Sequence, residues 1–88
     1  MAWEVRVKQA AQKQIEGLHP TVGRRIVSRL EKLAENPYPS GTKKLSGEEG
    51  LFRLRVGDWR IIYQVRESIL LVLVVKVGHR RDVYRKMV

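Results

Sequence analysis

The chain has 88 residues, of which 43% are apolar and none is cysteine. This length allows one hydrophobic core, so we expect a single domain spanning residues 1–88, and the composition excludes disorder, disulfides and thiolate metal sites. No stretch approaches the roughly 18 to 20 apolar residues of a membrane span, and no signal-peptide pattern opens the sequence, so we expect a cytoplasmic location. Eighteen Lys and Arg against nine Asp and Glu give a net charge of +9. Such an excess is typical of proteins that bind a polyanion, nucleic acid foremost.

The first third of the chain predicts a strand followed by two helices. Residues 3–7 alternate between apolar and charged side chains, as in a half-buried strand. Residues 8–18 are good helix formers with an apolar stripe. Pro20 ends this helix, because the residue before a proline avoids helical geometry, and opens a second helix that runs to about Glu35. We therefore expect two antiparallel helices joined by a tight turn.

The remainder predicts a polar loop and then β-structure. Residues 36–50 are interpreted as a solvated connection. Residues 51–56 and 59–66 form two strands around Gly57-Asp58, a two-residue hairpin turn. The apolar run 69–77 is typical of a central strand covered on both faces. The predicted fold is α+β: an N-terminal strand, a helical hairpin, then a three-stranded antiparallel meander, with the helices packed on one face of the sheet.

Counting outward from the hairpin turn predicts which side chains share a face. Arg55 opposes Arg60, and since side chains alternate, Arg53 joins them on one face. The opposite, apolar face contains Phe52, Leu54, Val56, Trp59, Ile61, Tyr63 and Val65. Opposed like charges cost within about 0.2–1 kcal/mol, a local penalty expected at a functional site. The alternative is a solvated sheet face on which Asp58 or Glu67 offsets the repulsion.

The tail that follows the last strand is basic. Residues 78–85 contain three arginines, a histidine and a tyrosine. Arginine binds phosphate bidentately, and tyrosine can stack on an unpaired base, so this composition suits RNA. Two alternatives remain open: Tyr84 can be a packed C-terminal anchor, and His79 a surface residue at a strand end.

Two segments resemble the RelE/ParE toxin superfamily. They are residues 52–63, FRLRVGDWRIIY, and 77–84, VGHRRDVY, and Asn36-Pro37 and Lys44-Leu45 also fit. The resemblance covers essentially the whole chain. It implies a bacterial or archaeal toxin of a type II toxin–antitoxin system, neutralised by a cognate antitoxin. RelE-type toxins cut mRNA in the ribosomal A site by attack of a ribose 2′-hydroxyl on the adjacent phosphate. ParE-type toxins instead poison DNA gyrase.

The resemblance also implies the roles of individual residues. In the RelE branch the site has two basic residues on one strand, an arginine on the next, an arginine after the central strand and a C-terminal tyrosine. These positions correspond to Arg53, Arg55, Arg60, Arg80 and Tyr84. The basic residues expected to bind RNA around them are Lys43, Lys44, His79, Arg81 and Arg85. Because all five catalytic positions are filled, the sequence favours the RelE branch.

One departure affects the expected mechanism. The paired strand positions are often lysine in the family, whereas here both are arginine, which stays protonated at any working pH and is a poor base. The base is therefore unassigned: Tyr84 or His79 can serve, or catalysis is mainly positioning and charge stabilisation.

No histidine or carboxylate cluster has a recognised metal-ligand spacing, so we expect a metal-independent reaction without a cofactor. The competing hypotheses are a ParE-like gyrase inhibitor and an RNA-binding protein that cleaves nothing. The basic surface suggests an antitoxin with an acidic segment.

Overall fold

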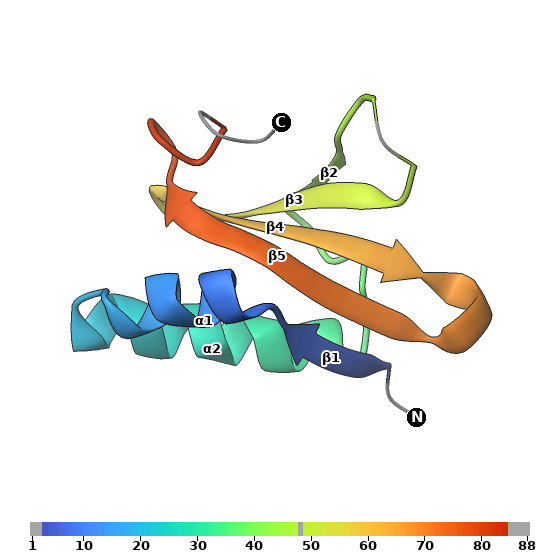
Figure 1. Cartoon of the computed structure of the whole chain (residues 1–88), viewed down its shortest axis with the longest axis horizontal. Coiled ribbons are helices and arrows are strands. Elements are labelled where there is room, and N and C mark those ends of the chain that lie inside the picture. Colours follow the sequence, from blue (N-terminus) through green and yellow to red (C-terminus); the bar gives the residue numbers. More distant parts are fainter. Residues whose placement is uncertain (1–2, 48, 85–88) are drawn as a thin grey trace.

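The computed structural model describes residues 3–47 and 49–84 and has the α+β fold expected from the sequence (Figure 1). Strand β1 and two helices come first, followed by four further strands. The elements in chain order are β1 Glu4–Val7, α1 Gln9–Glu16, α2 Pro20–Leu33, β2 Thr42–Lys44, β3 Leu51–Val56, β4 Trp59–Arg66, a 3-10 turn at Glu67–Ile69, and β5 Leu71–His79. Within the described residues, no helix has the length and apolar content needed to cross a membrane.

The strands form one mixed sheet in the order β1-β5-β4-β3-β2. The meander β3-β4-β5 is antiparallel, as predicted. Strand β1, whose partner the sequence did not predict, pairs with β5 in parallel, which makes the sheet mixed. Parallel neighbours need a long crossover connection, and residues 8–70, which include both helices and strands β2 to β4, provide it here. Both helices cover one face of the sheet, and residues 80–84, which follow β5, lie over the other (Figure 1).

The β3–β4 hairpin has the register counted from the sequence. Val56 pairs with Trp59, Arg55 with Arg60, and Leu54 with Ile61. Gly57 has a φ of 60°, which a type II′ turn requires at its first central position and which glycine adopts without strain. The register directs the alternate apolar residues of both strands toward the helices, where Leu54, Val56, Ile61, Tyr63 and Val65 are buried in the main core and Phe52 and Trp59 pack against it.

The helices begin and end close to the predicted positions. Pro20 is the first residue of α2, where its missing N–H has no intrahelical partner to lose, and the ring of His19 caps the helix by accepting a hydrogen bond from Thr21 N–H at 3.2 Å. Helix α1 packs under β5, and Gln14 Oε1 accepts a hydrogen bond from Val77 N–H at 2.8 Å. Strand β1 pairs with β5 only as far as Val74, so the backbone N–H of Val77 lies on an unpaired strand edge, and Gln14 supplies its acceptor.

The segment expected to be only a solvated connection contains strand β2. Thr42–Lys44 pair antiparallel with residues 52–54 of β3. The buried Tyr63 holds this region, because its hydroxyl donates to Pro37 O at 2.7 Å and lies 3.1 Å from Thr42 Oγ1. Burial raises the pKa of Tyr63, and the hydrogen bond with Thr42 lowers it in part.

The last strand also differs from its prediction. It begins at Leu71 rather than Ile69, because Glu67–Ile69 form a 3-10 turn, and it continues to His79. A bulge in its pairing with β4 falls between Ile62 and Tyr63. As predicted, the strand is central, between β1 and β4. Its residues that face the helices are buried, and Leu71 and Leu73 on the other face are half-buried.

Candidate active site

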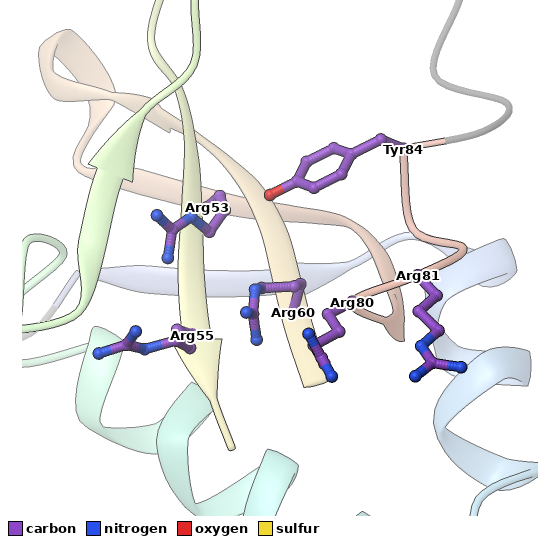
Figure 2. A pocket seen from close by; sticks show the side chains of 6 residues that line it. All are labelled: Arg53, Arg55, Arg60, Arg80, Arg81 and Tyr84. Atoms are coloured by element: carbon purple, nitrogen blue, oxygen red, sulfur yellow. The ribbon is translucent and has the colours of Figure 1, made fainter. Parts of the chain in front are cut away.

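A hollow of about 320 Å³ lies on the sheet face opposite the helices (Figure 2). Strand β3, strand β4 and the tail after β5 each contribute to it. It is lined by Arg53, Arg55, Arg60, Arg80, Arg81 and Tyr84. The structure thus brings together all five residues predicted as catalytic, and adds one predicted to bind RNA. Figure 2 shows Arg53, Arg60 and Arg80 between Arg55 on one side and Arg81 on the other.

The hairpin turn orients Arg60. Its Nη1 donates to the carbonyl oxygens of Gly57 and Trp59, both at 2.9 Å. These bonds hold the guanidinium of Arg60 at the backbone of the turn, while Arg55 lies directly opposite Arg60 in the register. Backbone carbonyls therefore offset part of the like-charge penalty, and Arg60 still lines the hollow.

The same turn positions Arg80. The backbone N–H of Arg80 donates to Asp58 O at 2.8 Å, and its Nε lies 3.3 Å from Asp58 Oδ1. Both side chains are at least half exposed, so solvent screens this ion pair and its effect on stability is small. Its effect on geometry is direct, because it fixes the start of the tail against the tip of the β3–β4 hairpin.

Val83 fixes the end of the tail. The N–H groups of Asp82 and Val83 both donate to His79 O at 2.9 Å, so the chain turns back over the sheet. Val83 is fully buried and packs with Leu51, Ile62 and the half-buried Leu45 in a second, smaller core. The sequence reasoning missed this residue, although an apolar side chain within a basic tail is a detectable signal.

Tyr84 follows Val83 directly and is 46% exposed. Its hydroxyl is directed over the sheet toward Arg53 and Arg60 (Figure 2). The alternative of Tyr84 as a packed anchor is therefore wrong, since the neighbouring Val83 is the buried side chain. In chemical terms the hollow contains five permanent cations and one hydroxyl, a set that can bind and neutralise a phosphate group.

Of the residues expected to bind RNA, two lysines occupy different faces. Lys43 pairs with Arg53 across β2 and β3, so it is an exposed extension of the arginine face. Lys44 pairs with Phe52, which faces the opposite side, and it lines a separate hollow with Tyr38 and Glu67. There the hydroxyl of Tyr38 donates to Glu67 Oε2 at 2.5 Å, and burial together with this carboxylate raises the pKa of Tyr38 to about 12.

His79 is not among the residues that line the arginine hollow. It pairs with Trp59, and the two rings make an edge-to-face contact with centroids 5.5 Å apart. Its Nδ1 accepts a hydrogen bond from Arg81 N–H at 3.2 Å. Arg85, also predicted to bind RNA, lies outside the described residues. Among residues 3–47 and 49–84, no three histidine, aspartate or glutamate side chains gather closely enough to hold a metal ion.

Comparison with known proteins identifies the family. Residues 5–84 match the family model of the ParE toxin of the type II toxin–antitoxin system parDE. The chain belongs to this toxin family. A putative RelE-like toxin protein from Escherichia coli is 33% identical over 96% of this chain and 92% of its own length. Toxin RelG from Mycobacterium tuberculosis is 26% identical over 98% of this chain and all of its own length.

Solved structures extend the similarity to three dimensions. The RelE–RelB complex from Pyrococcus horikoshii contains a chain that matches 93% of this toxin with a TM-score of 0.82 and 26% identity, over 99% of that chain. The toxin–antitoxin complex RelBE2 from M. tuberculosis matches 91% with a TM-score of 0.80 and 26% identity, over all of that chain. The predicted membership of the RelE/ParE superfamily is confirmed.

Proposed function

We propose that this toxin is an endoribonuclease that cleaves mRNA, with the ribosome as the place of cleavage. The observation that carries the proposal is the convergence of Arg53, Arg60 and Arg80 with Tyr84 in one hollow. Attack of a ribose 2′-hydroxyl on the adjacent phosphorus forms a 2′,3′-cyclic phosphate and breaks the P–O5′ bond, and the proton lost by the 2′-hydroxyl is balanced by one gained by the released 5′-oxygen. The transition state places extra negative charge on the phosphate oxygens. Preorganised guanidinium groups stabilise that charge in the transition state more than in the ground state, which is what accelerates a reaction.

Tyr84 is proposed to position the attacking hydroxyl. Among the six residues lining the hollow it carries the one group that can accept a hydrogen bond, because arginine side chains only donate. His79 fits a role as base poorly, since its ring packs on Trp59 and its Nδ1 is already bonded to Arg81 N–H. Catalysis here rests on positioning and charge stabilisation, with RNA supplying its own nucleophile.

The partner proposed for regulation is a cognate antitoxin protein. Related toxins were solved in complex with RelB antitoxins. The arginine hollow and the net charge of +9 favour an antitoxin with an acidic segment that covers this face.

A test compares Arg80→Ala and Arg53→Ala with Arg66→Ala. Arg66 is an exposed residue at the far end of β4, outside the hollow. Because it is also an arginine, its replacement by alanine changes the net charge by the same amount as the two hollow variants. We expect the two hollow variants to cleave about 10²–10³-fold more slowly, the usual cost of removing one transition-state donor. Arg66→Ala is expected to cleave like wild type. The readout is mapping of transcript 5′ ends after brief induction, and thermal unfolding verifies that each variant folds. Hollow variants that cleave at the wild-type rate would refute the proposal.

A second candidate is inhibition of DNA gyrase without RNA cleavage. The matching family model carries the ParE description, which favours it. It predicts intact transcripts and accumulating DNA breaks in the same induction experiment. The filled arginine hollow favours the ribonuclease, because inhibition by binding alone does not need a phosphate site.

A further inference from the structure

Helix α2 places a further arginine against the tip of the β3–β4 hairpin. A Cβ atom at position 57 would lie 3.4 Å from Nη1 of Arg25, so the guanidinium of Arg25 rests on Gly57. The carbonyl of the same glycine accepts from Arg60 Nη1. Arg25 comes from the helical layer and Arg60 from the hollow on the other side of the sheet. Positive charge therefore continues around the hairpin tip from one face of the molecule to the other.

Arg25 is the first member of a cationic stripe along α2. Arg29 and Lys32 follow at spacings of four and seven residues, which places all three on one face of the helix. We call these three residues the α2 ridge. It extends about 10 Å at the helical rise of ~1.5 Å per residue. Figure 2 shows α2 beside the end of β3 that carries Arg55. The contact of Arg25 with Gly57 places the start of the ridge at the tip of the β3–β4 hairpin.

The ridge side chains are available to an outside partner. Arg25 and Lys32 are exposed, and Arg29 is half-buried. The ion pairs found among residues 3–47 and 49–84 join Arg6 to Glu4 and Arg80 to Asp58, and none involves the ridge. The acidic residue of the helix, Glu31, lines a groove between the two helices, away from this stripe. Three cations aligned on one face of the helix repel one another, a cost in stability that a polyanionic partner would remove.

We propose that the α2 ridge binds the RNA backbone outside the cleavage site, so that one strand runs from the arginine hollow around the hairpin tip onto α2. This inference rests on the proposal that the hollow holds RNA. It assigns to the ridge a phosphate-binding role without base recognition, because the ridge contains cations but no aromatic side chain that could stack on a base. The ridge adds affinity for longer RNA and leaves the chemistry at the hollow unchanged.

The test measures binding of 2′-O-methyl RNA, which cannot be cleaved because its 2′-hydroxyls are blocked. The ridge variant is Arg25→Ala/Arg29→Ala/Lys32→Ala. The matched control is Lys8→Ala/Lys13→Ala/Arg24→Ala, which removes the same charge from exposed positions elsewhere on the helical layer. Each is measured with an RNA of about 4 nucleotides and one of about 12, that is ~14 and ~41 Å at ~3.4 Å per nucleotide.

For the longer RNA, we expect the ridge variant to reduce the slope of log affinity against log salt by about 2, since each single-strand phosphate contact contributes ~0.7. The affinity at ~0.1 M salt then falls by about 10- to 100-fold. The control variant should bind both RNAs like wild type, and the ridge variant should bind the short RNA like wild type.

Three results would overturn the inference. An equal loss in the ridge and control variants would indicate a general charge effect. A loss for the short RNA as large as for the long one would place the defect in the hollow. Weaker binding of poly-L-glutamate with unchanged binding of RNA would make the ridge a surface for an acidic protein. Failure of the proposed ribonuclease activity is recognised separately, because it appears as intact transcripts with wild-type toxin while the binding measurements stand.

Discussion

Val83→Ala tests whether the small core under the tail is what positions Arg80, Arg81 and Tyr84. Val83 is fully buried against Leu51 and Ile62. The substitution removes two buried methyl groups, each worth about 0.8 kcal/mol, so the docked tail loses about 1.6 kcal/mol. At ~1.4 kcal/mol per factor of ten, the equilibrium between docked and undocked tail shifts about 15-fold.

Hydrogen exchange measures this shift directly. The N–H of Val83 is bonded to His79 O in the docked tail, so its exchange reports local opening. We expect protection at residue 83 to fall about 15-fold while the amides of β4 hardly change. RNA cleavage falls as well, to the extent that the tail spends time undocked. The stronger Val83→Asp undocks the tail outright, since an unpaired charge is not tolerated in the small core, and it should cleave RNA as slowly as Tyr84→Ala.

Val27→Ala serves as the control. It makes the same chemical change at a position on α2 that is 42% exposed, and it should leave both exchange and cleavage unaltered. The reasoning is refuted if Val83→Asp retains wild-type cleavage, because the docked tail would then not be what places Tyr84 over the sheet.

Two further predictions concern stability. The pKa of Tyr38 is raised to about 12 from 10.0, so the unfolded chain releases this proton before the folded one does; stability therefore falls as pH rises from about 10 to 12. In urea titrations across this range, the unfolding free energy of Tyr38→Phe should decline less steeply with pH than that of wild type. Lysines titrate in both proteins and contribute equally to the decline, so equal slopes for the two proteins would contradict the assignment. Gln14→Leu leaves the half-buried N–H of Val77 without its acceptor, at a cost of about 1–3 kcal/mol, and should lower the melting temperature. Gln14→Glu keeps an acceptor oxygen in place and should melt closer to wild type; if both variants melt alike, the bond contributes little.

The sequence predicted elements well where local patterns determine them. Strands β3 and β4 begin and end at the predicted residues, because alternation and a two-residue turn define both ends of each strand. The parallel pairing of β1 with β5 could not be predicted, because periodicity says nothing about which strand is the partner. Strand β2 was missed for a related reason: three residues in a polar loop carry no strand pattern, and contacts to Tyr63 hold that region in place.

The site could be predicted to the extent that it follows from the hairpin register. Counting residues outward from Gly57-Asp58 predicted that Arg53, Arg55 and Arg60 share a face, and the register agrees. For Lys44 and His79 the face depends on pairings that sequence alone does not reveal, and both lie outside the arginine hollow. Arg25 joins the hairpin tip from a different layer, and only the packing of α2 on the sheet makes that contact visible.

The pairing of Glu4 with Leu71 has a consequence for how the toxin folds. It joins the first strand of the chain to its last one, a contact between residues far apart in sequence whose closure costs more chain entropy than a local hairpin does. The residues that complete the hollow, Arg80, Arg81 and Tyr84, follow directly after this last strand. A chain whose helices and β3–β4 hairpin have formed but whose last strand is unpaired therefore has three of the five hollow arginines in place and no closed phosphate site. The complete phosphate site forms only with the complete sheet.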